Sequence, residues 1–334
     1  MLILSLVLAL TGSAAPAHHS GSEYDYDHIV EIEGILVELA WQNPHVLLRV
    51  RTAASGQRAG MIWDIEGSSV SVLRRSNVDP RKLHVGEKVR VAGEQSKRAP
   101  NRMFAHNLLA ADGTELVFHP GGKPRWAKSA MGTSGDWFSA GAKDAPGAGL
   151  FRVWSSKLDD PQQLWLPEYP LTAAAKNTFA KWDPVRDDVA QGCNPKGMPT
   201  IMETPYPLEF VREGDVIRLR IEEYDLVRTI HPAGKVSRES LQKHLLGRSI
   251  GRWEGTTLVV ETDGILWRFI DPSGAPLSVA ASLVERFTPS ADGTTLHYSL
   301  VITDPENLVK PVTLKRSWVA RPNESVKPYA CGKS

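Results

Sequence analysis

The chain has 334 residues, with 39 lysines and arginines, 38 aspartates and glutamates, and a formal net charge of +1 at pH 7. This length suits two ordinary domains. The balanced charge leaves no basic surplus for a nucleic-acid backbone, so the composition argues against a nucleic-acid-binding protein. After the first residues, the sequence has no apolar run long enough to cross a bilayer.

The chain opens with an apolar run from Leu2 to Leu10, which has the length of a signal-peptide core and is too short to span a membrane. Ala15-Pro16-Ala17 then fits the A-x-A cleavage rule. We therefore expect a signal peptide over residues 1–17. The mature protein would be periplasmic or secreted and would carry no transmembrane anchor.

Cleavage after Ala17 would make His18 the first residue of the mature protein. Its free α-amine and imidazole, with the imidazole of His19, would then offer three nitrogen donors of the kind that suit Cu(II), Ni(II) or Zn(II). We expect copper binding there. The alternative is that both histidines belong to a solvated tail.

Residues 18–118 alternate short apolar strands with turn-rich connections, and one short helix is expected within SSVSVLRRSN. Five or six strands with one small helix predict an OB-like barrel. Residues 119–148 are rich in Gly, Pro, Ser and Ala and are typical of a linker.

Residues 149–334 begin a second domain, in which Thr172 is a plausible N-cap for a helix that ends at Asp183-Pro184. From Pro207 onward, short strands are joined by tight glycine turns such as Glu254-Gly255. This pattern predicts an antiparallel, lipocalin-like barrel or a strongly curved sheet, and the chain as a whole is expected to be mainly β.

Two features of the N-terminal part form a recognisable combination. His-His-Ser follows the leader, and Trp-Gln-Asn-Pro-His-Val (41–46) precedes the run Val-Gly-Glu-Lys-Val-Arg-Val-Ala-Gly (85–93). Over residues 18–118 the chain resembles a family of secreted bacterial domains of unknown function, whose members carry a Trp-x-Asn-Pro-His motif. The resemblance implies export and no particular activity.

The C-terminal part has its own signature, Gly-Arg-Trp-Glu-Gly-x-Thr-Leu-Val-Val-Glu-Thr (251–262), followed by Val-Glu-Arg-Phe (284–287). Over about residues 150–331 the chain resembles an uncharacterised family of exported bacterial proteins. The chain departs from that family's pattern at Ala233 and Arg248, so a site built on those positions would be lost or altered here.

The chain has two cysteines, Cys193 and Cys331. In an oxidising compartment, two cysteines predict one long-range disulfide. Both also match the pattern of the C-terminal family, which adds to the prediction. Two unpaired thiols are the alternative.

Histidines supply the candidate metal ligands. His45 starts a predicted strand and His106 lies within another, so both could join His18 and His19 at one site of the OB-like barrel. The sequence has no H-x-x-x-H and no C-x-x-C spacing. His45 as a capping or core residue and His106 as a surface residue stay open.

Charged residues recur inside the strands of the second domain. Those that point inward would be costly to bury unless they are paired or bind a ligand. Together with Trp253, and with Trp267 and Tyr298 beside it, they could line a small-molecule cavity. The candidate ligand-binding residues are Glu209, Arg220, Glu222, Arg228, Trp253, Glu261, Arg286 and His297.

Three functions therefore stay open. The first is an exported protein that binds a metal ion or a small apolar ligand. The second is an enzyme that uses Glu and His for acid–base chemistry in the barrel cavity. The third is a scaffold protein. The sequence indicates neither a catalytic residue nor an oligomeric state.

Overall fold

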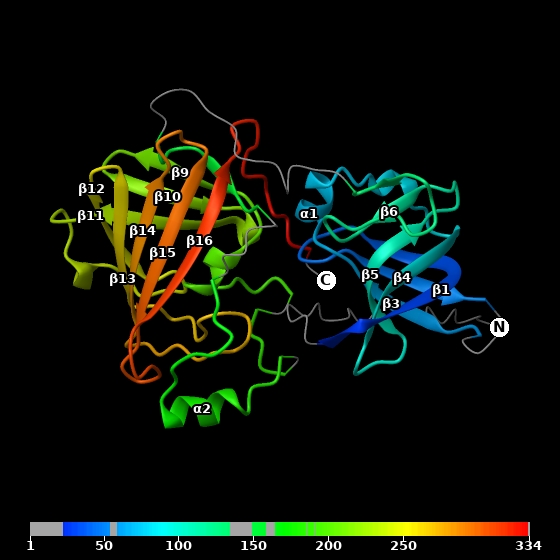
Figure 1. Cartoon of the computed structure of the whole chain (residues 1–334), viewed down its shortest axis with the longest axis horizontal. Coiled ribbons are helices and arrows are strands. Elements are labelled where there is room, and N and C mark those ends of the chain that lie inside the picture. The colour runs from blue at the N-terminus through cyan, green and yellow to red at the C-terminus, as the bar shows by residue number, and fades with distance from the viewer. Residues whose placement is uncertain are drawn as a thin grey trace, which may run out of the picture.

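The structure is a computed structural model that describes residues 23–53, 59–133, 149–157, 164–184, 186–190 and 192–332. The chain is mainly β and forms an N-terminal sheet and a closed C-terminal barrel, which stand side by side (Figure 1). The predicted fold class is confirmed. No helix in the described residues has the length and hydrophobicity needed to cross a membrane.

The N-terminal sheet contains seven strands, one α-helix and a short 3-10 helix. In chain order these are β1 (Tyr24–Ala40), β2 (Leu47–Thr52), β3 (Ile62–Glu66), α1 (Val70–Arg75), η2 (Pro80–Lys82), β4 (Lys88–Ser96), β5 (Arg102–Leu109), β6 (Glu115–Val117) and β7 (Ala130–Met131).

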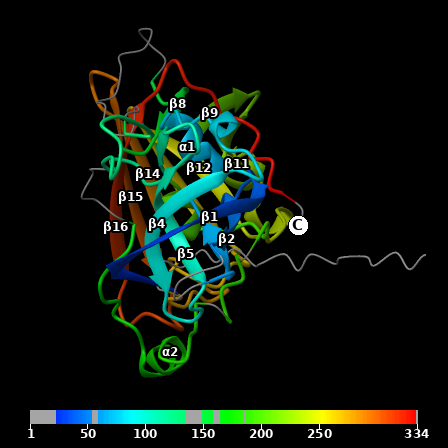
Figure 2. The same ribbon diagram turned by 90° about the vertical axis from the view of Figure 1, so that its right-hand side faces the viewer.

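Strands β1 to β5 follow the connectivity of an OB barrel. The order β3-β2-β1-β4-β5 is closed by a parallel pairing of β3 with β5, and α1 connects β3 to β4. Figure 2, which faces this domain, shows β1 crossing in front of β4 and β5. Alternate residues such as Leu36, Val50 and Trp63 are fully buried and fill the interior.

The C-terminal barrel contains the remaining strands, with one α-helix beside it. These are β8 (Val153–Ser155), α2 (Ala173–Phe179), η4 (Thr200–Glu203), β9 (Leu208–Glu213), β10 (Val216–Ile221), η5 (Glu223–Asp225), β11 (Leu226–Pro232), η6 (Arg238–Ser240), β12 (Arg248–Glu254), β13 (Thr257–Asp263), β14 (Ser282–Pro289), β15 (Thr295–Thr303) and β16 (Val312–Ala320).

Nine strands close this barrel in the order β10-β11-β12-β13-β14-β15-β16-β8-β9. Eight of the pairings are antiparallel, as expected, but β11 and β12 run parallel. A parallel pair cannot be joined by a tight turn, and the chain between these two strands accordingly includes η6. Helix α2 begins as predicted, because the Thr172 side chain accepts a hydrogen bond from the Ala175 amide.

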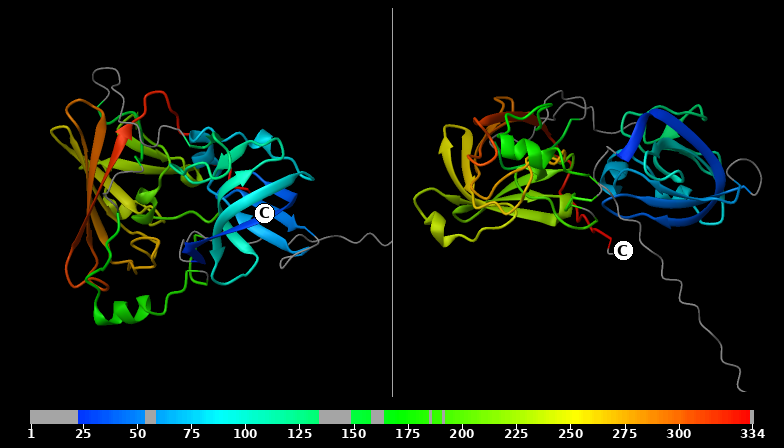
Figure 3. Two further views of the ribbon diagram at one scale, coloured as in Figure 1. Left: turned by 45° about the vertical axis from the view of Figure 1, so that its right-hand side comes forward. Right: turned by 90° about the horizontal axis from the view of Figure 1, so that it is seen from below.

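The end of the chain ties the two domains together. Cys193 and Cys331 form the predicted disulfide. The side-chain amide of Asn43 donates to the Tyr329 carbonyl, and the Gly332 amide donates to the Asn43 carbonyl at 3.0 Å. Figure 3 shows this C-terminal segment running between the two domains. The Trp-x-Asn-Pro-His motif therefore holds the segment that the disulfide anchors.

Several sequence predictions fall partly or wholly outside the described residues. The signal peptide (1–17), His18 and His19 lie there, as do residues 134–148 of the expected linker. Within the part of that linker that is described, β7 pairs with β6 and extends the N-terminal sheet.

Candidate functional site

The eight predicted ligand-binding residues are not brought together. Only Arg228 lies in the barrel core, on the same face of β11 as Ile230. Glu209 and Arg220 lie in the opposite phase of their strands and pair with each other at 2.9 Å on the outer surface. The strand period of two decides this, because the apolar residues beside them occupy the inward positions.

The other predicted residues also lie outside the barrel core. Glu261 and Arg286 form surface ion pairs with Arg252 and Glu254, respectively. His297 is exposed on β15. Trp253 is 42% exposed at the end of β12.

Glu222 has a different role. It is completely buried just after β10 and accepts a hydrogen bond from Arg74 of the N-terminal domain at 2.8 Å. Its other oxygen accepts from the Lys327 amide at 3.0 Å. Glu222 therefore joins α1, the barrel and the C-terminal segment, and it does not share a site with Arg228.

The barrel interior holds a closed polar network around Arg228. Its guanidinium donates to Ser249, Thr262 and both carboxylate oxygens of Glu285, and the Tyr298 hydroxyl donates to Glu285 at 2.8 Å. Burial lowers the pKa of Arg228, but the adjacent Glu285 carboxylate outweighs this and raises it, so Arg228 stays charged. The side chains of Arg228 and Glu285 have no exposed surface, so this network serves the core.

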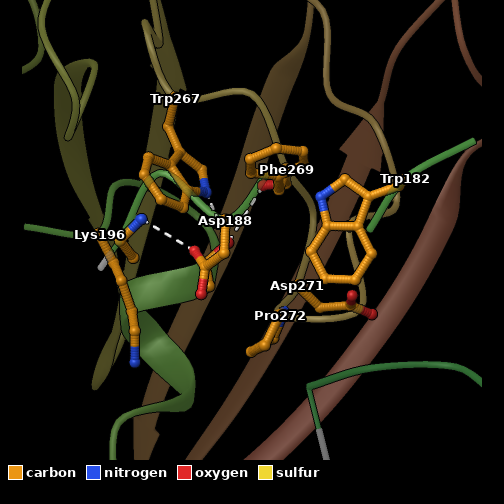
Figure 4. Close-up of a pocket in the computed structure, with 10 residues that line it drawn as sticks. Trp182, Asp188, Lys196, Trp267, Phe269, Asp271 and Pro272 are labelled. Atoms are coloured by element: carbon orange, nitrogen blue, oxygen red, sulfur yellow. Dashed lines mark hydrogen bonds between the residues drawn. The ribbon is translucent and has the colours of Figure 1, made fainter. Parts of the chain in front are cut away.

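A pocket lies at the end of the barrel where β13 leaves and β14 enters. It is a shallow hollow that opens to solvent, and its enclosed part has room for about one water molecule. The residues whose side chains define it are Trp182, Asp188, Lys196, Trp267, Phe269 and Asp271 (Figure 4). They come from two connections, the segment after α2 and the long loop from β13 to β14.

Three aromatic rings form the walls of this pocket. The ring centroids of Trp267 and Phe269 are 5.6 Å apart at an interplanar angle of 80°, and those of Trp182 and Phe269 are 6.3 Å apart at 67°. The Trp267 indole N–H donates to the Thr200 hydroxyl at 2.7 Å. Within the part of the chain that the structure describes, the buried indole N–H of Trp182 has no hydrogen-bond partner, and Figure 4 shows it on the side facing Phe269.

Two glycines let the aromatic rings approach the chain this closely. A Cβ at Gly274 would lie 2.2 Å from the Trp182 ring, and Gly274 has a φ of +88°. A Cβ at Gly197 would lie 2.4 Å from the Trp267 Cβ. Both positions therefore require glycine, and the two tryptophans can pack this closely against their connections only because glycine is present.

The carboxylate of Asp271 is held firmly beneath the aromatic rings. It accepts hydrogen bonds from the Tyr169 hydroxyl and from the amide and hydroxyl of Ser273, and Asp271 is only 2% exposed. Nearby, burial raises the pKa of Glu203; the charges of Arg316 and Lys196 lower it, and those of Asp271 and Glu223 raise it. Carboxyl groups and cationic side chains are therefore mixed at this end of the barrel.

The predicted metal ligand His45 pairs with a buried carboxylate. Its Nδ1 lies 3.0 Å from the Gly67 carbonyl oxygen and 3.2 Å from Glu66 Oε1. Glu66 is 5% exposed and also accepts a hydrogen bond from Tyr24 at 2.7 Å. His45 thus contributes to a polar cluster of the OB-like barrel.

His106 belongs to a neighbouring cluster on β4 and β5. Its Nε2 lies 2.8 Å from Glu94 Oε1, and its ring stacks on His119 with centroids 5.4 Å apart. Burial lowers the pKa values of both histidines and raises that of Glu94. Both imidazoles are therefore neutral at pH 7.

The described residues contain no group of three or more His, Cys, Asp or Glu side chains that could hold a metal ion. His45 and His106 each face a carboxylate instead of a shared metal position. The prediction that they join His18 and His19 around copper stays a prediction, because His18 and His19 lie outside the described residues.

Comparison with known proteins finds a family match for one part of the chain. Residues 6–103 match the model of a family of unknown function, DUF6152. The match falls on the N-terminal part of the chain and agrees with the expected resemblance to a family of unknown function. No curated protein matches the chain.

The sequence analysis predicts a different cavity, inside the barrel, with Trp267 beside the charged strand residues. It does not name Trp182 or Phe269. Both lie in connections without strand or helix periodicity, so their spacing carries no information. The available signal was the presence of large aromatic residues in polar, glycine-containing loops, where a structural core would not require them.

Proposed function

We propose that the protein is an exported binding protein that holds a small organic ligand in the pocket at the end of the C-terminal barrel. The observation that carries this proposal is the aromatic pocket itself. Three rings border a space that reaches solvent, and the Trp182 indole N–H at its edge has no hydrogen-bond partner among the described residues. Apolar walls with a few directed polar groups are typical of small-molecule sites.

The size of the pocket limits the ligand. Its enclosed part has room for about one water molecule, far less than the sites that hold drug-sized molecules. The ligand is therefore a molecule of few heavy atoms, or the terminal group of a larger one. Its polar part would accept a hydrogen bond from Trp182.

Export is supported by the leader sequence and by the disulfide. Residues 1–17 carry the apolar run and the A-x-A site of a signal peptide. The Cys193–Cys331 bond is of the kind that persists in oxidising compartments. Fractionation of cells that produce the full chain, followed by N-terminal sequencing, tests this; we expect a mature protein outside the cytoplasm that begins at His18.

A fragment screen on the full mature chain tests ligand binding. We expect some small amphipathic compounds to raise the melting temperature, and Trp182→Leu to abolish that increase. Trp253→Leu removes an exposed indole at the end of β12, away from the pocket, and should leave the increase unchanged. The proposal fails if no compound binds, or if both variants respond alike.

A further inference from the structure

The C-terminal segment, residues 321–332, runs from the end of β16 to the N-terminal domain (Figure 1). At its start, the Arg321 amide donates to the Val153 carbonyl of the barrel at 3.0 Å. Near its end, Cys331 forms a β-bridge with Asn43 of the N-terminal domain and the disulfide with Cys193. The disulfide therefore fixes the part of the segment that lies against the N-terminal domain.

Contacts along the segment reach two parts of the N-terminal domain. Glu324 pairs with Arg75 of α1 at 3.4 Å. The Asn43 side chain donates to the Tyr329 carbonyl, and the Asn43 carbonyl accepts from the Gly332 amide at 3.0 Å. Helix α1 and the motif around Asn43 thus both bind the segment.

The same segment also binds the barrel. The Lys327 amide donates to Glu222 at 3.0 Å, and the Tyr329 amide donates to Asp225 at 2.9 Å. The Tyr329 ring packs against Tyr224, with ring centroids 5.1 Å apart. The segment therefore contacts both domains within a few residues of the disulfide.

Direct polar contacts between the domains give less support. Arg74 pairs with buried Glu222 at 2.8 Å, but the ion pair of Arg98 and Asp183 is partly exposed to solvent and contributes little. Within the described residues, Oδ1 of buried Asn43 has no hydrogen-bond partner, which is unfavourable for the closed junction. The bound segment therefore supplies a large part of what joins the two domains.

The two ends of the disulfide differ in accessibility. Cys193 is exposed, whereas Cys331 is half-buried beside Asn43. A thiolate opens a disulfide by attacking one of its sulfur atoms, so the rate depends on access to that atom. Exposed disulfides are accordingly the labile ones among the disulfides of secreted proteins. An external thiolate would attack the Sγ atom of Cys193 first.

We propose that the Cys193–Cys331 bond is a redox switch, which a dithiol reductant opens at Cys193 to release the C-terminal segment from the N-terminal domain. One thiolate of the reductant attacks Cys193 Sγ, the S–S bond breaks, and Cys331 leaves as a thiolate that takes up a proton. The second thiolate of the reductant then attacks the mixed disulfide and displaces the Cys193 thiolate, which is also protonated. The reductant loses two electrons and ends as a disulfide.

The first experiment locates the attack in the full mature chain under native conditions. Reduced glutathione, a monothiol, traps the mixed disulfide, and mass mapping after alkylation of free thiols with N-ethylmaleimide identifies the modified cysteine. We expect the first glutathione adduct on Cys193 and the first alkylated thiol on Cys331. A first adduct on Cys331, or reaction only after unfolding by denaturant, would overturn the proposal.

The second experiment tests release of the segment by hydrogen exchange, before and after reduction with dithiothreitol. Reduction should lower the protection of the Lys327, Tyr329 and Gly332 amides at least about tenfold, because the segment then opens locally while the domains stay folded. Amides of β1 and β14 should keep their protection. Small-angle scattering should show a larger radius of gyration in the reduced protein.

A variant with both Cys193→Ser and Cys331→Ser is the matched control. It should resemble the reduced protein without reductant, and dithiothreitol should change it no further. If the segment amides keep their protection after both thiols are reduced, the bond is not a switch. If β1 and β14 lose protection as much as the segment does, the bond stabilises the fold as a whole and the proposal is wrong.

Discussion

The barrel interior and the pocket at its end contain the same kinds of side chain, arranged to opposite effect. In the interior, Arg228 and Glu285 satisfy each other with the help of three hydroxyl groups, and no surface is left for a ligand. In the pocket, rings and carboxylates border a space that reaches solvent. Charged and aromatic residues in a barrel therefore indicate a binding site only where they remain accessible.

Two indole groups sharpen this comparison. The N–H groups of Trp182 and Trp318 are both buried, and neither has a hydrogen-bond partner among residues 23–332 as far as these are described. Trp318 lies in the filled core with no exposed surface, whereas Trp182 borders the pocket. An unpartnered donor alone therefore does not define a site; its position beside an accessible space does.

The largest effect is expected from breaking the interior network. Glu285→Leu leaves the Arg228 charge buried without its partner and should lower the free energy of unfolding by about 3–5 kcal/mol. Urea denaturation measures this, with the exposed Glu261→Leu as a control that costs no more than about 1 kcal/mol. A loss below 1 kcal/mol for Glu285→Leu would show that the network is not structural.

Removal of the disulfide should reduce the local stability of the pocket more than that of the barrel interior. Replacing Cys193 and Cys331 by serine should cost about 2–4 kcal/mol, because the bond closes a long loop. Hydrogen exchange should show that amides of residues 193–203 lose protection while those of β14 keep theirs. Equal loss in both regions would contradict the distinction between them.

A larger side chain in the pocket wall should lower stability less than removal of the disulfide does, and it should also weaken ligand binding. Gly274→Ala places a methyl group against Trp182 and should destabilise the fold by about 1–3 kcal/mol. Gly255→Ala has a similar positive φ in open space, so it reports the backbone cost alone. Only Gly274→Ala should reduce the response to fragments; an equal response in the two variants would place the ligand elsewhere.

The smallest effect concerns the free energy of unfolding and its dependence on pH through one buried carboxyl group, Glu203. Burial raises the pKa of Glu203, so folding favours its protonated form. Its contribution to stability is therefore complete at low pH and is lost as the pH rises through the raised pKa. Glu203→Gln should thus stabilise the protein at pH 7 and lose this advantage at about pH 4.

Denaturant unfolding at the two pH values measures this difference, and Glu209→Gln on the outer surface is the control. A stabilisation by Glu203→Gln that is the same at both pH values would show that ionisation of Glu203 is not its cause.

The sequence predicts the folds of both domains better than it predicts the site. Alternating strands, turn glycines and the Thr172 cap are local signals, and the structure confirms the elements they predict. The parallel pairing of β11 with β12 was missed because pairing direction depends on the route of the connecting chain. The position of Glu222 at the domain contact was missed because its partner, Arg74, lies in the other domain.

The site depended on loops that bring residues together only after the barrel has closed. Trp182 and Trp267 are distant in sequence and meet through two non-periodic connections. The charged residues that did show strand periodicity mostly faced outward, since apolar residues took the inward positions. Periodicity therefore located the core and not the pocket.

The most direct test of the account is an NMR titration that observes the indole N–H groups of the full mature chain. Tryptophan variants assign the signals, and the compounds that bind in the fragment screen serve as ligands. The account predicts that the signals of Trp182 and Trp267 shift with ligand while those of Trp154 and Trp318, buried in the barrel core, stay in place. Shifts at Trp318 without shifts at Trp182 would contradict it and place the ligand inside the barrel.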